Sequence, residues 1–369
     1  MGKTASLANI GSIADSSLGF RNRLINSAMV IDQRNAGASS TTPTVGAGTY
    51  SSVDRFAYIV SQASKFTMQQ TPSATETGFA TRVAAGFSNY LACTVGASAN
   101  VTIGASDYFA IYQSIEGLNV SDLAWGTANA KTITLSFLVY SSVTGTFGGS
   151  LRNGGFNRSY PFTYSIPTAN TWTSISITIA GDTSGVWSTT NGIGIVVSFS
   201  LGVGATFTAT AGAWTAGNYS SATGAVSPIT TNSATFYITG VQLEKGSTAT
   251  SFDYRPYGTE LALCQRYLPT ANAADYYTGL SATSTAAYSS IKFPVTARVG
   301  PTGISVSSVT AYTTTNGGGS PIAVTAISFG AAGINSSLIR FDVASGLTAG
   351  QATATVIGTA PLLFTGCEL

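Results

Sequence analysis

The sequence predicts an all-β protein with an N-terminal arm, a jelly-roll β-sandwich, a short linking helix and a smaller C-terminal β-sandwich. Apolar and polar residues alternate over many short segments, and turns rich in glycine, asparagine and serine separate these segments. Hydrophobic residues make up 44% of the 369 residues and charged residues only 8%, against about 25% in ordinary globular proteins. The chain therefore has ample core material, and its length allows roughly two or three domains.

The first segment, residues 1–51, differs in character from the rest. Leu7, Ile10 and Ile13 stand among small residues and cannot build a core alone. We expect this segment to be an arm that docks onto another protein.

Strand patterns run through residues 52–254 and predict the jelly roll. Isoleucine, leucine, valine and phenylalanine recur at every second position in three segments, Ile133–Val139, Ile175–Ile179 and Ile193–Phe199. Glycine-rich turns lie between them at residues 148–150, 152–155 and 181–183, which is the spacing of an antiparallel sandwich.

A linker, residues 255–268, follows the last strand pattern of this domain. Arg255-Pro256 disfavours helix before the proline, and Thr259-Glu260 then opens a predicted helix over Leu261–Leu268. Short isolated helices are marginal in water, so this one either connects two sandwiches in solvent or packs in an interface.

Strand patterns start again beyond the linker and predict a compact C-terminal sandwich over residues 269–369. The alternating residues lie around positions 288–295, 304–306, 324–327, 339–343 and 356–364. Glycine-rich turns at 317–320 and 346–350 separate them.

Charge and hydropathy exclude several partners. The net charge is +2 and no cluster of Lys and Arg is present, so we expect no nucleic-acid binding. No apolar run is long enough for a membrane-spanning helix, and no signal peptide follows Lys3, so we expect no membrane insertion and no conventional secretion.

Catalytic and metal chemistry have little support. Histidine is absent, and the three cysteines, Cys93, Cys264 and Cys367, lack metal or redox spacing and are expected to be buried free thiols. Glu116 with Asp122, and Asp253 with Glu260, are the nearest carboxylate pairs, and turn capping or pairing with arginine explains them better than glycoside cleavage. Glycine-rich segments match no nucleotide-binding motif. We expect no catalytic residue, no metal and no cofactor.

Three segments carry a resemblance to known proteins. Phe20–Gly37, Tyr50–Phe56 and Val241–Leu268 are similar to a family of bacteriophage tail-fibre and related receptor-binding proteins, which have a jelly roll like that of carbohydrate-binding modules. Ser27 and Phe56 stand where this family suggests glycine and tryptophan. Residues beyond the linker match no motif, as in a variable tip.

The resemblance implies a structural virion protein without enzymatic activity. It would be made in the host bacterial cytoplasm, form a homotrimer, dock onto tail or other virion proteins through residues 1–51, and bind a host-surface glycan. No heptad repeat is present, so the trimer would form through sandwich faces or through the linker helix, where three copies of Leu261, Cys264 and Leu268 could meet at an axis.

Glycan binding makes certain aromatic residues candidates, because apolar faces of sugar rings stack on aromatic side chains. Trp187, Trp214 and Tyr219 lie in or beside turns, and Tyr276 and Tyr277 follow the linker. Trp125 and Trp172 are expected in the core. An aromatic residue in a jelly roll more often anchors a core or loop than binds a ligand, and that alternative applies to every candidate.

Two other functions remain open at this point. A capsid-decorating or head-fibre protein would share the low charge, the arm and the β domains. A polysaccharide depolymerase would need an acidic cleft, usually on a repetitive β-helix, and the sequence shows neither the repeats nor the carboxylate pairs.

Overall fold

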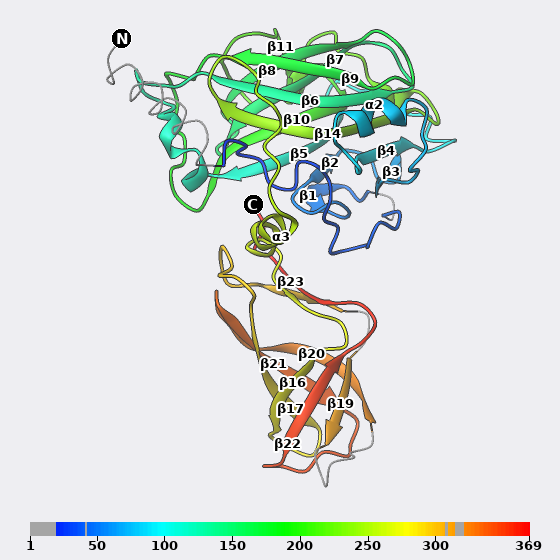
Figure 1. The fold of residues 1–369 in the computed structure, drawn as a ribbon, viewed down its shortest axis with the longest axis vertical. Helices are drawn as coiled ribbons and strands as arrows, with labels where there is room; N and C mark the ends of the chain where they lie inside the picture. Colours follow the sequence, from blue (N-terminus) through cyan, green and yellow to red (C-terminus); the bar gives the residue numbers. More distant parts are fainter. Residues whose placement is uncertain (1–19, 41–42, 307–308, 314–320) are drawn as a thin grey trace, which may run out of the picture. The chain divides into compact units, whose positions relative to one another are not determined.

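The computed structural model describes residues 20–40, 43–306, 309–313 and 321–369 (Figure 1). The chain divides into two compact units, Met1–Arg255 and Pro256–Leu369. The all-β prediction is confirmed, because the described residues contain only two α-helices, α2 (Phe79–Ala84) and α3 (Tyr257–Gln265). Neither described helix is long and apolar enough to cross a membrane.

The first unit is a β-sandwich of two large sheets. The seven-stranded sheet has the order β1 (Gly46–Tyr50), β2 (Ala57–Val60), β5 (Tyr108–Glu116), β10 (Ile193–Val203), β7 (Gly145–Asn153), β8 (Arg158–Ile166) and β12 (Thr215–Ala216). The five-stranded sheet has the order β3 (Phe66–Gln70), β4 (Leu91–Val95), β14 (Thr235–Lys245), β6 (Ile133–Ser141) and β9 (Thr173–Ile179).

Short elements complete the first unit. β11 (Thr208–Ala209) and β13 (Ser221–Ala222) form a small parallel pair. The single-turn 3₁₀ helices are η1 (Gly117–Asn119), η2 (Ser121–Leu123), η3 (Ala205–Phe207) and η4 (Pro228–Thr230).

The core of the first unit is built from the facing side chains of its two large sheets. Ile133, Leu135, Phe137 and Val139 of β6 are all buried there, as their alternation predicts. Trp125 and Trp172 are buried as well, in agreement with the sequence analysis.

Strand β14 shows why apolar spacing can change within one strand. Phe236 and Ile238 are two residues apart, but the next buried pair is Val241 and Leu243. The register with β6 shifts between Thr239 and Gln242, and Gly240 within this shift has φ +60°. A bulge of this kind adds one residue and restores the same inward face, and glycine adopts its left-handed backbone readily.

Two of the motif segments named above lock together in space although they are more than 200 residues apart. Asp253 accepts hydrogen bonds from the backbone N–H groups of Arg21 and Asn22, at 2.8 and 3.2 Å. The Asn22 side chain donates to Val241 O at 3.0 Å and accepts from Leu243 N at 3.1 Å. We call these contacts, together with those of Arg255, the motif clamp.

Arg255 completes the motif clamp from the end of the first unit. Its guanidinium donates to the carbonyl oxygens of Asn22 and Leu24. It also lies over the ring of Phe20, 4.9 Å from the centroid. The described part of the predicted arm, from Phe20 onward, is therefore built into the first unit instead of standing apart, because its backbone groups find their partners there. The arm residues 1–19 lie outside the described part of the chain.

The second unit closes into a barrel, where the sequence predicted a sandwich. The barrel strands follow the order β16 (Tyr276–Ser281), β17 (Ala286–Lys292), β21 (Ser336–Val343), β20 (Pro321–Ala332), β19 (Val309–Thr313) and β22 (Ala352–Ile357). A three-stranded sheet of β15 (Thr270–Ala271), β23 (Leu362–Thr365) and β18 (Gly303–Ser305) completes the unit. Antiparallel pairing of β16 with β22 joins the first and last barrel strands, and this pairing distinguishes a barrel from a sandwich.

Helix α3 begins four residues earlier than predicted and ends three residues earlier, because Pro256 itself serves as the N-cap with an extended backbone. Cys264 and Leu268 are buried in the described chain, and Leu261 is half-buried. A role for these three residues in a trimer interface stays a prediction. All three cysteines are buried and free.

Candidate functional site

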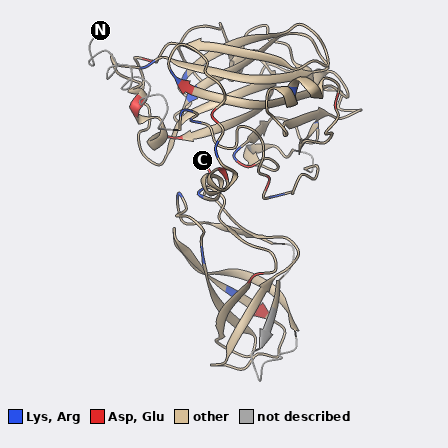
Figure 2. Cartoon of the chain, in the orientation of Figure 1, with Lys and Arg blue, Asp and Glu red and all other residues tan. Residues whose placement is uncertain are grey.

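The five predicted aromatic residues are divided between the two units. Trp187, Trp214 and Tyr219 belong to the first unit, and Tyr276 and Tyr277 belong to the second. Lys, Arg, Asp and Glu take up only short stretches of the ribbon in both units (Figure 2).

Trp187 and Trp214 pack against the buried Trp125 in what we call the tryptophan cluster. The centroid of Trp125 lies 4.8 Å from that of Trp187 and 5.2 Å from that of Trp214, and Trp187 lies 5.2 Å from Trp214. All three contacts are edge-to-face, the arrangement that the charge distribution of aromatic rings favours. Tyr160 of β8 adds a fourth ring, 5.2 Å from Trp214.

Every indole N–H of the tryptophan cluster has a backbone partner. Trp125, Trp187 and Trp214 donate to the carbonyl oxygens of Lys131, Ser184 and Ala180, at 2.8, 3.1 and 2.7 Å. The cavity beside Trp125 and Trp187 measures about 10 Å³, room for one water molecule at most. The cluster therefore fastens three loops to the sandwich and leaves no indole N–H for a ligand.

An ion pair between half-buried Arg158 and buried Asp182 holds one of these loops. Arg158 donates from Nε and Nη2 to the two carboxylate oxygens of Asp182, at 2.8 and 2.6 Å. The hydrogen bond to Asp182 raises the pKa of Arg158 above its usual range. The fork of two parallel bonds fixes the loop that leads to Trp187.

Tyr219 lies half-buried beside the turn at Gly217. Its ring covers Gly217, where an added Cβ would stand 2.5 Å from the ring, and its backbone N–H donates to Ser159 Oγ at 3.0 Å. These contacts make Tyr219 an anchor of its turn. Asn218 of the same turn accepts a hydrogen bond from Arg152 of the seven-stranded sheet.

Tyr276 and Tyr277 are neighbours on β16 and point to opposite sides of the barrel wall. Tyr277 packs against the interior core with Ile291 and Ile339. Tyr276 is 68% exposed. Because side chains alternate along a strand, only Tyr276 of the two can present its ring to a ligand.

Tyr276 shares its outer surface with other large side chains, and we call this surface the barrel face: Tyr276, Leu280, Tyr288, Leu338 and Arg340. Leu280 is 53% exposed and pairs across strands with Tyr288. Tyr288 and Leu338 both lie over Gly330, where an added Cβ would stand 3.1 Å from each. Tyr288 in turn pairs with Arg340.

The polar edge of the barrel face is an exposed ion pair. Arg340 donates from Nε to Asp342 at 2.9 Å, and its Nη2 lies 2.8 Å from the same carboxylate oxygen. The hydrogen bond to Asp342 raises the pKa of Arg340, and Tyr288 adds to this effect. The barrel face thus combines an exposed ring with groups that donate and accept hydrogen bonds, the combination that orients a ligand on a protein surface.

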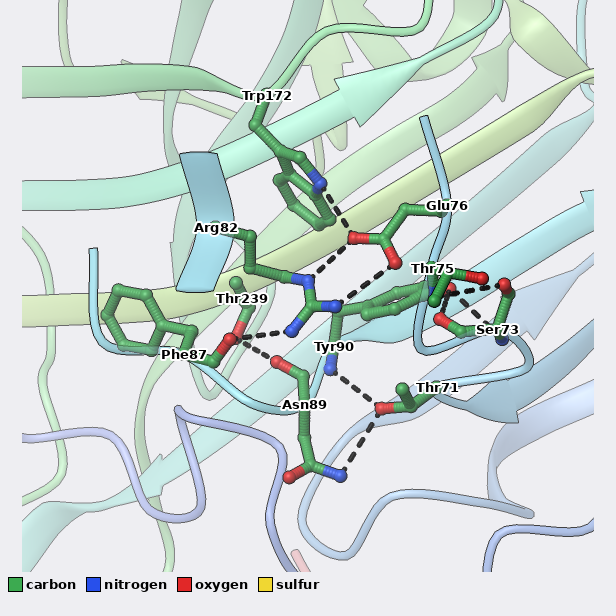
Figure 3. A network of polar contacts seen from close by, with 10 residues as sticks. All are labelled: Thr71, Ser73, Thr75, Glu76, Arg82, Phe87, Asn89, Tyr90, Trp172 and Thr239. Carbon is green, nitrogen blue, oxygen red and sulfur yellow. Dashed lines mark hydrogen bonds and ion pairs between the residues drawn. The ribbon is translucent and has the colours of Figure 1, made fainter. Parts of the chain in front are cut away.

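A second polar network was missed by the sequence analysis and lies in the first unit (Figure 3). Arg82 of α2 donates to both carboxylate oxygens of Glu76, at 2.7 and 3.1 Å, and to Phe87 O at 2.6 Å. Trp172 donates its indole N–H to Glu76 at 3.0 Å. The guanidinium also lies 5.0 Å from the ring centroid of Tyr90. The single Arg and Glu, six residues apart, gave no sequence signal that distinguishes them from surface charges.

Burial and hydrogen bonding act in opposite directions on Glu76. Burial favours the neutral acid, but hydrogen bonds from Arg82, from the backbone and from Trp172 favour the carboxylate and prevail, so the pKa of Glu76 is lowered. Every group in this network is occupied by another side chain or by the backbone. The network therefore has a structural role, because it holds α2 against the five-stranded sheet.

The carboxylates singled out from the sequence have structural partners. Asp122 lies 2.9 Å from Arg23 and 3.4 Å from Lys245, and Asp253 belongs to the motif clamp. No group of three or more metal-binding side chains occurs among the described residues.

A groove of about 430 Å³ lies in the second unit. Its walls are Ile304, Ser305, Val306, Val309, Val324, Thr325, Ala326 and Ile327. None of these side chains is aromatic or charged, so the groove lacks the groups that select a sugar.

No family model and no curated protein matches the chain. Among solved structures, it is similar to an enzymatically active domain of tailspike protein 4 of bacteriophage CBA120, at 11% identity and a TM-score of 0.29 over 61% of this chain and 21% of that one. A CBM4 carbohydrate-binding module gives 12% identity and a TM-score of 0.29 over 60% of this chain and 98% of the module.

A putative sugar-binding protein of Bacteroides thetaiotaomicron gives 10% identity and a TM-score of 0.31 over 61% of this chain and its own full length. The structural neighbours are thus carbohydrate-binding proteins and a phage tailspike domain, all at low scores. The chain spans about a fifth of the tailspike domain it matches, which is 21% of that chain.

Proposed function

We propose that this chain is a non-enzymatic tail-fibre protein of a bacteriophage that binds a glycan on the host surface. The observation that carries the proposal is the barrel face, where Tyr276 exposes its ring beside Leu280 and next to the Arg340–Asp342 pair. Sugar rings have an apolar face that stacks on such a ring and hydroxyl groups that bond to charged neighbours.

The dimensions of the barrel face suit an extended chain of sugars. Tyr276 and Leu280 are four residues apart on β16, which corresponds to about 13 Å along the strand. Between them β22 contributes the small side chains Ala352 and Ala354, which pair with Leu280 and Thr278. Small residues beside large ones give a shallow, open surface, suited to binding a polymer anywhere along its length.

The virion assignment rests on the resemblance of the motif segments, and the motif clamp supports it. Segments that were recognised separately in the sequence, around Phe20 and around Asp253, hydrogen-bond to each other. Their residues therefore form one structural unit, which explains why they would be kept together in a protein family.

The proposal is tested with the full-length chain on an array of bacterial capsular and lipopolysaccharide glycans. We expect binding to at least one glycan, and a loss of roughly tenfold in affinity for Tyr276→Ala. Tyr257→Ala, which removes an exposed ring elsewhere in the same unit, is the matched control and should bind normally. A chain that binds no glycan, or binds equally well without Tyr276, contradicts the proposal.

Experiments on the purified chain and on the intact phage particle distinguish a tail fibre from a head fibre or decorating protein and from a depolymerase. Labelled antibody at the tail of the particle supports a tail fibre, and label on the capsid supports a head fibre or decorating protein. Release of reducing ends from a bound polysaccharide would support a depolymerase. Light scattering should give the mass of three chains, since we also propose a homotrimer.

A further inference from the structure

The seven-stranded sheet and the short strand β13 that packs on it carry buried polar groups that lack hydrogen-bond partners. They are the side-chain oxygens of four serines and one guanidinium nitrogen: Ser114, Ser150, Ser198, Ser221 and Arg152 Nε. Buried polar atoms in native proteins are almost always satisfied, so several together in one place call for a missing partner.

Strand register places these groups next to one another. Val196 of β10 pairs with Ser114 on one side and Arg152 on the other. Ser198, one row along the same face, pairs with Ser150. The alternate residues Ile195 and Val197 belong to the core, so the polar rows face away from it.

Arg152 is the unusual member of this group. The residue is only 5% exposed, and burial lowers the pKa of its guanidinium to about 10. Nη1 donates to Asn218 Oδ1 at 2.9 Å, and the ring of Phe156 lies 5.1 Å away. Arg158 and Arg82 each have a carboxylate, but Arg152 makes no ion pair in the described part of the chain. A buried cation is costly unless an anion pairs with it.

Two of the side chains that contact Arg152 belong to exposed residues. Asn218 is exposed and lies in the turn beside Tyr219. Phe156 is 39% exposed and has φ +52°, a backbone region that large residues rarely adopt. Further along β7, the Ser221 hydroxyl lies directly above Gly148. Asn218 and Phe156 thus contact the guanidinium from exposed positions, and Asn218 offers it a neutral amide oxygen.

We propose that Arg152 is the centre of a binding site for a carboxylate, supplied by an acidic sugar of the uronate class. The carboxylate accepts from Nε and Nη2 of Arg152, which lie side by side on the edge of the guanidinium that Asn218 does not occupy. Hydroxyls of the sugar then meet Ser150, Ser198 and Ser114. The sugar identity rests on the glycan-binding function proposed above, whereas the carboxylate site rests on a buried guanidinium that has no carboxylate partner among the described residues.

Calorimetric titration of the full-length chain with sodium glucuronate, and with glucose as the neutral match, tests the site. We expect heat of binding for glucuronate only, with affinity at least roughly tenfold lower in Arg152→Gln. Lys292→Gln removes an exposed positive charge from another part of the chain and should bind glucuronate like the wild type. Equal responses to both sugars, or an unchanged affinity in Arg152→Gln, overturn the proposal.

A second variant keeps the test valid if Arg152→Gln does not fold. Asn218→Asp places a carboxylate at the exposed position that already contacts Arg152, so it should raise the melting temperature and abolish glucuronate binding. A lowered melting temperature with normal glucuronate binding overturns the proposal. If glycan binding requires Tyr276 but is changed neither by added glucuronate nor by Asn218→Asp, that result refutes the Arg152 site and leaves the proposed function intact. Glucuronate binding without any glycan binding on the array refutes the proposed function instead.

Discussion

In the first unit, three tryptophans turn their rings toward one another and donate every indole N–H to a backbone carbonyl. In the second unit, Tyr276 leaves 68% of its surface in solvent beside an exposed ion pair. Both sets of rings lie close to turns or strand ends, so position in the sequence did not separate them. The difference shows that a ring becomes available for ligands when strand alternation turns it outward, whereas a ring in a loop is used to hold that loop.

The largest effect should come from the polar network that braces the packed aromatic residues of the first unit. Replacing Arg82 with Met leaves the buried Glu76 carboxylate without its cation, and we expect a loss of about 3–5 kcal/mol in the free energy of unfolding. Urea denaturation measures it. Arg340→Met, which breaks the exposed pair of the barrel face, is the control and should leave the unfolding midpoint unchanged.

A substitution in the tryptophan cluster should lower the stability of the fold and leave glycan binding unchanged. Trp214→Ala removes three ring contacts and a hydrogen bond, and because the residue is half-buried we expect a loss of about 2–3 kcal/mol. Thermal unfolding measures the loss, and the glycan array measures binding. A stable variant that no longer binds glycan would reverse the roles assigned to the two regions.

Tyr276 and Tyr277 of β16 allow an outward-facing ring and an inward-facing ring to be compared within a single strand. Tyr277→Ala should destabilise the second unit by about 2 kcal/mol, because its ring packs in the barrel interior. Tyr276→Ala should change stability by less than about 0.5 kcal/mol and reduce glycan affinity roughly tenfold. Denaturation of the two variants side by side gives the answer, and similar losses in both would contradict the outward orientation of Tyr276.

The smallest effect concerns pH. The pKa of Glu76 is lowered in the folded chain, so its contribution to stability is complete above the ordinary glutamate pKa near 4.5 and is lost as the pH falls through the folded value. Unfolding midpoints between about pH 3 and 7 should therefore fall more steeply in the wild type than in Glu76→Gln. Parallel curves would show that Glu76 does not titrate differently in the folded state.

Much of the fold follows from periodicity. The alternation of Ile133, Leu135, Phe137 and Val139 reports a strand with one buried face, and the structure confirms it. Periodicity says nothing about which strands pair, so the closure of β16 onto β22 into a barrel was not predictable. The short helix α2 was also missed, since six residues are too few for a helical pattern.

The candidate sites were predicted less well because they depend on long-range contacts. Residue type suggested aromatic rings as candidates, and alternation alone would have separated Tyr276 from Tyr277. Nothing local indicates that Arg152 lacks a carboxylate, whereas Arg158, six residues away, has Asp182. The difference between the two arginines arises only in the folded chain, where Arg158 of β8 meets Asp182 and Arg152 of β7 meets the amide of Asn218.

The motif clamp has a mechanical consequence. The clamp brings Phe20 and Arg255 together, and these two side chains are in contact. Tension applied between these two residues is therefore carried first by the hydrogen bonds of Asn22, Asp253 and Arg255, two of which join Asn22 to strand β14. These bonds must break before such tension can extend the chain that lies between the two residues.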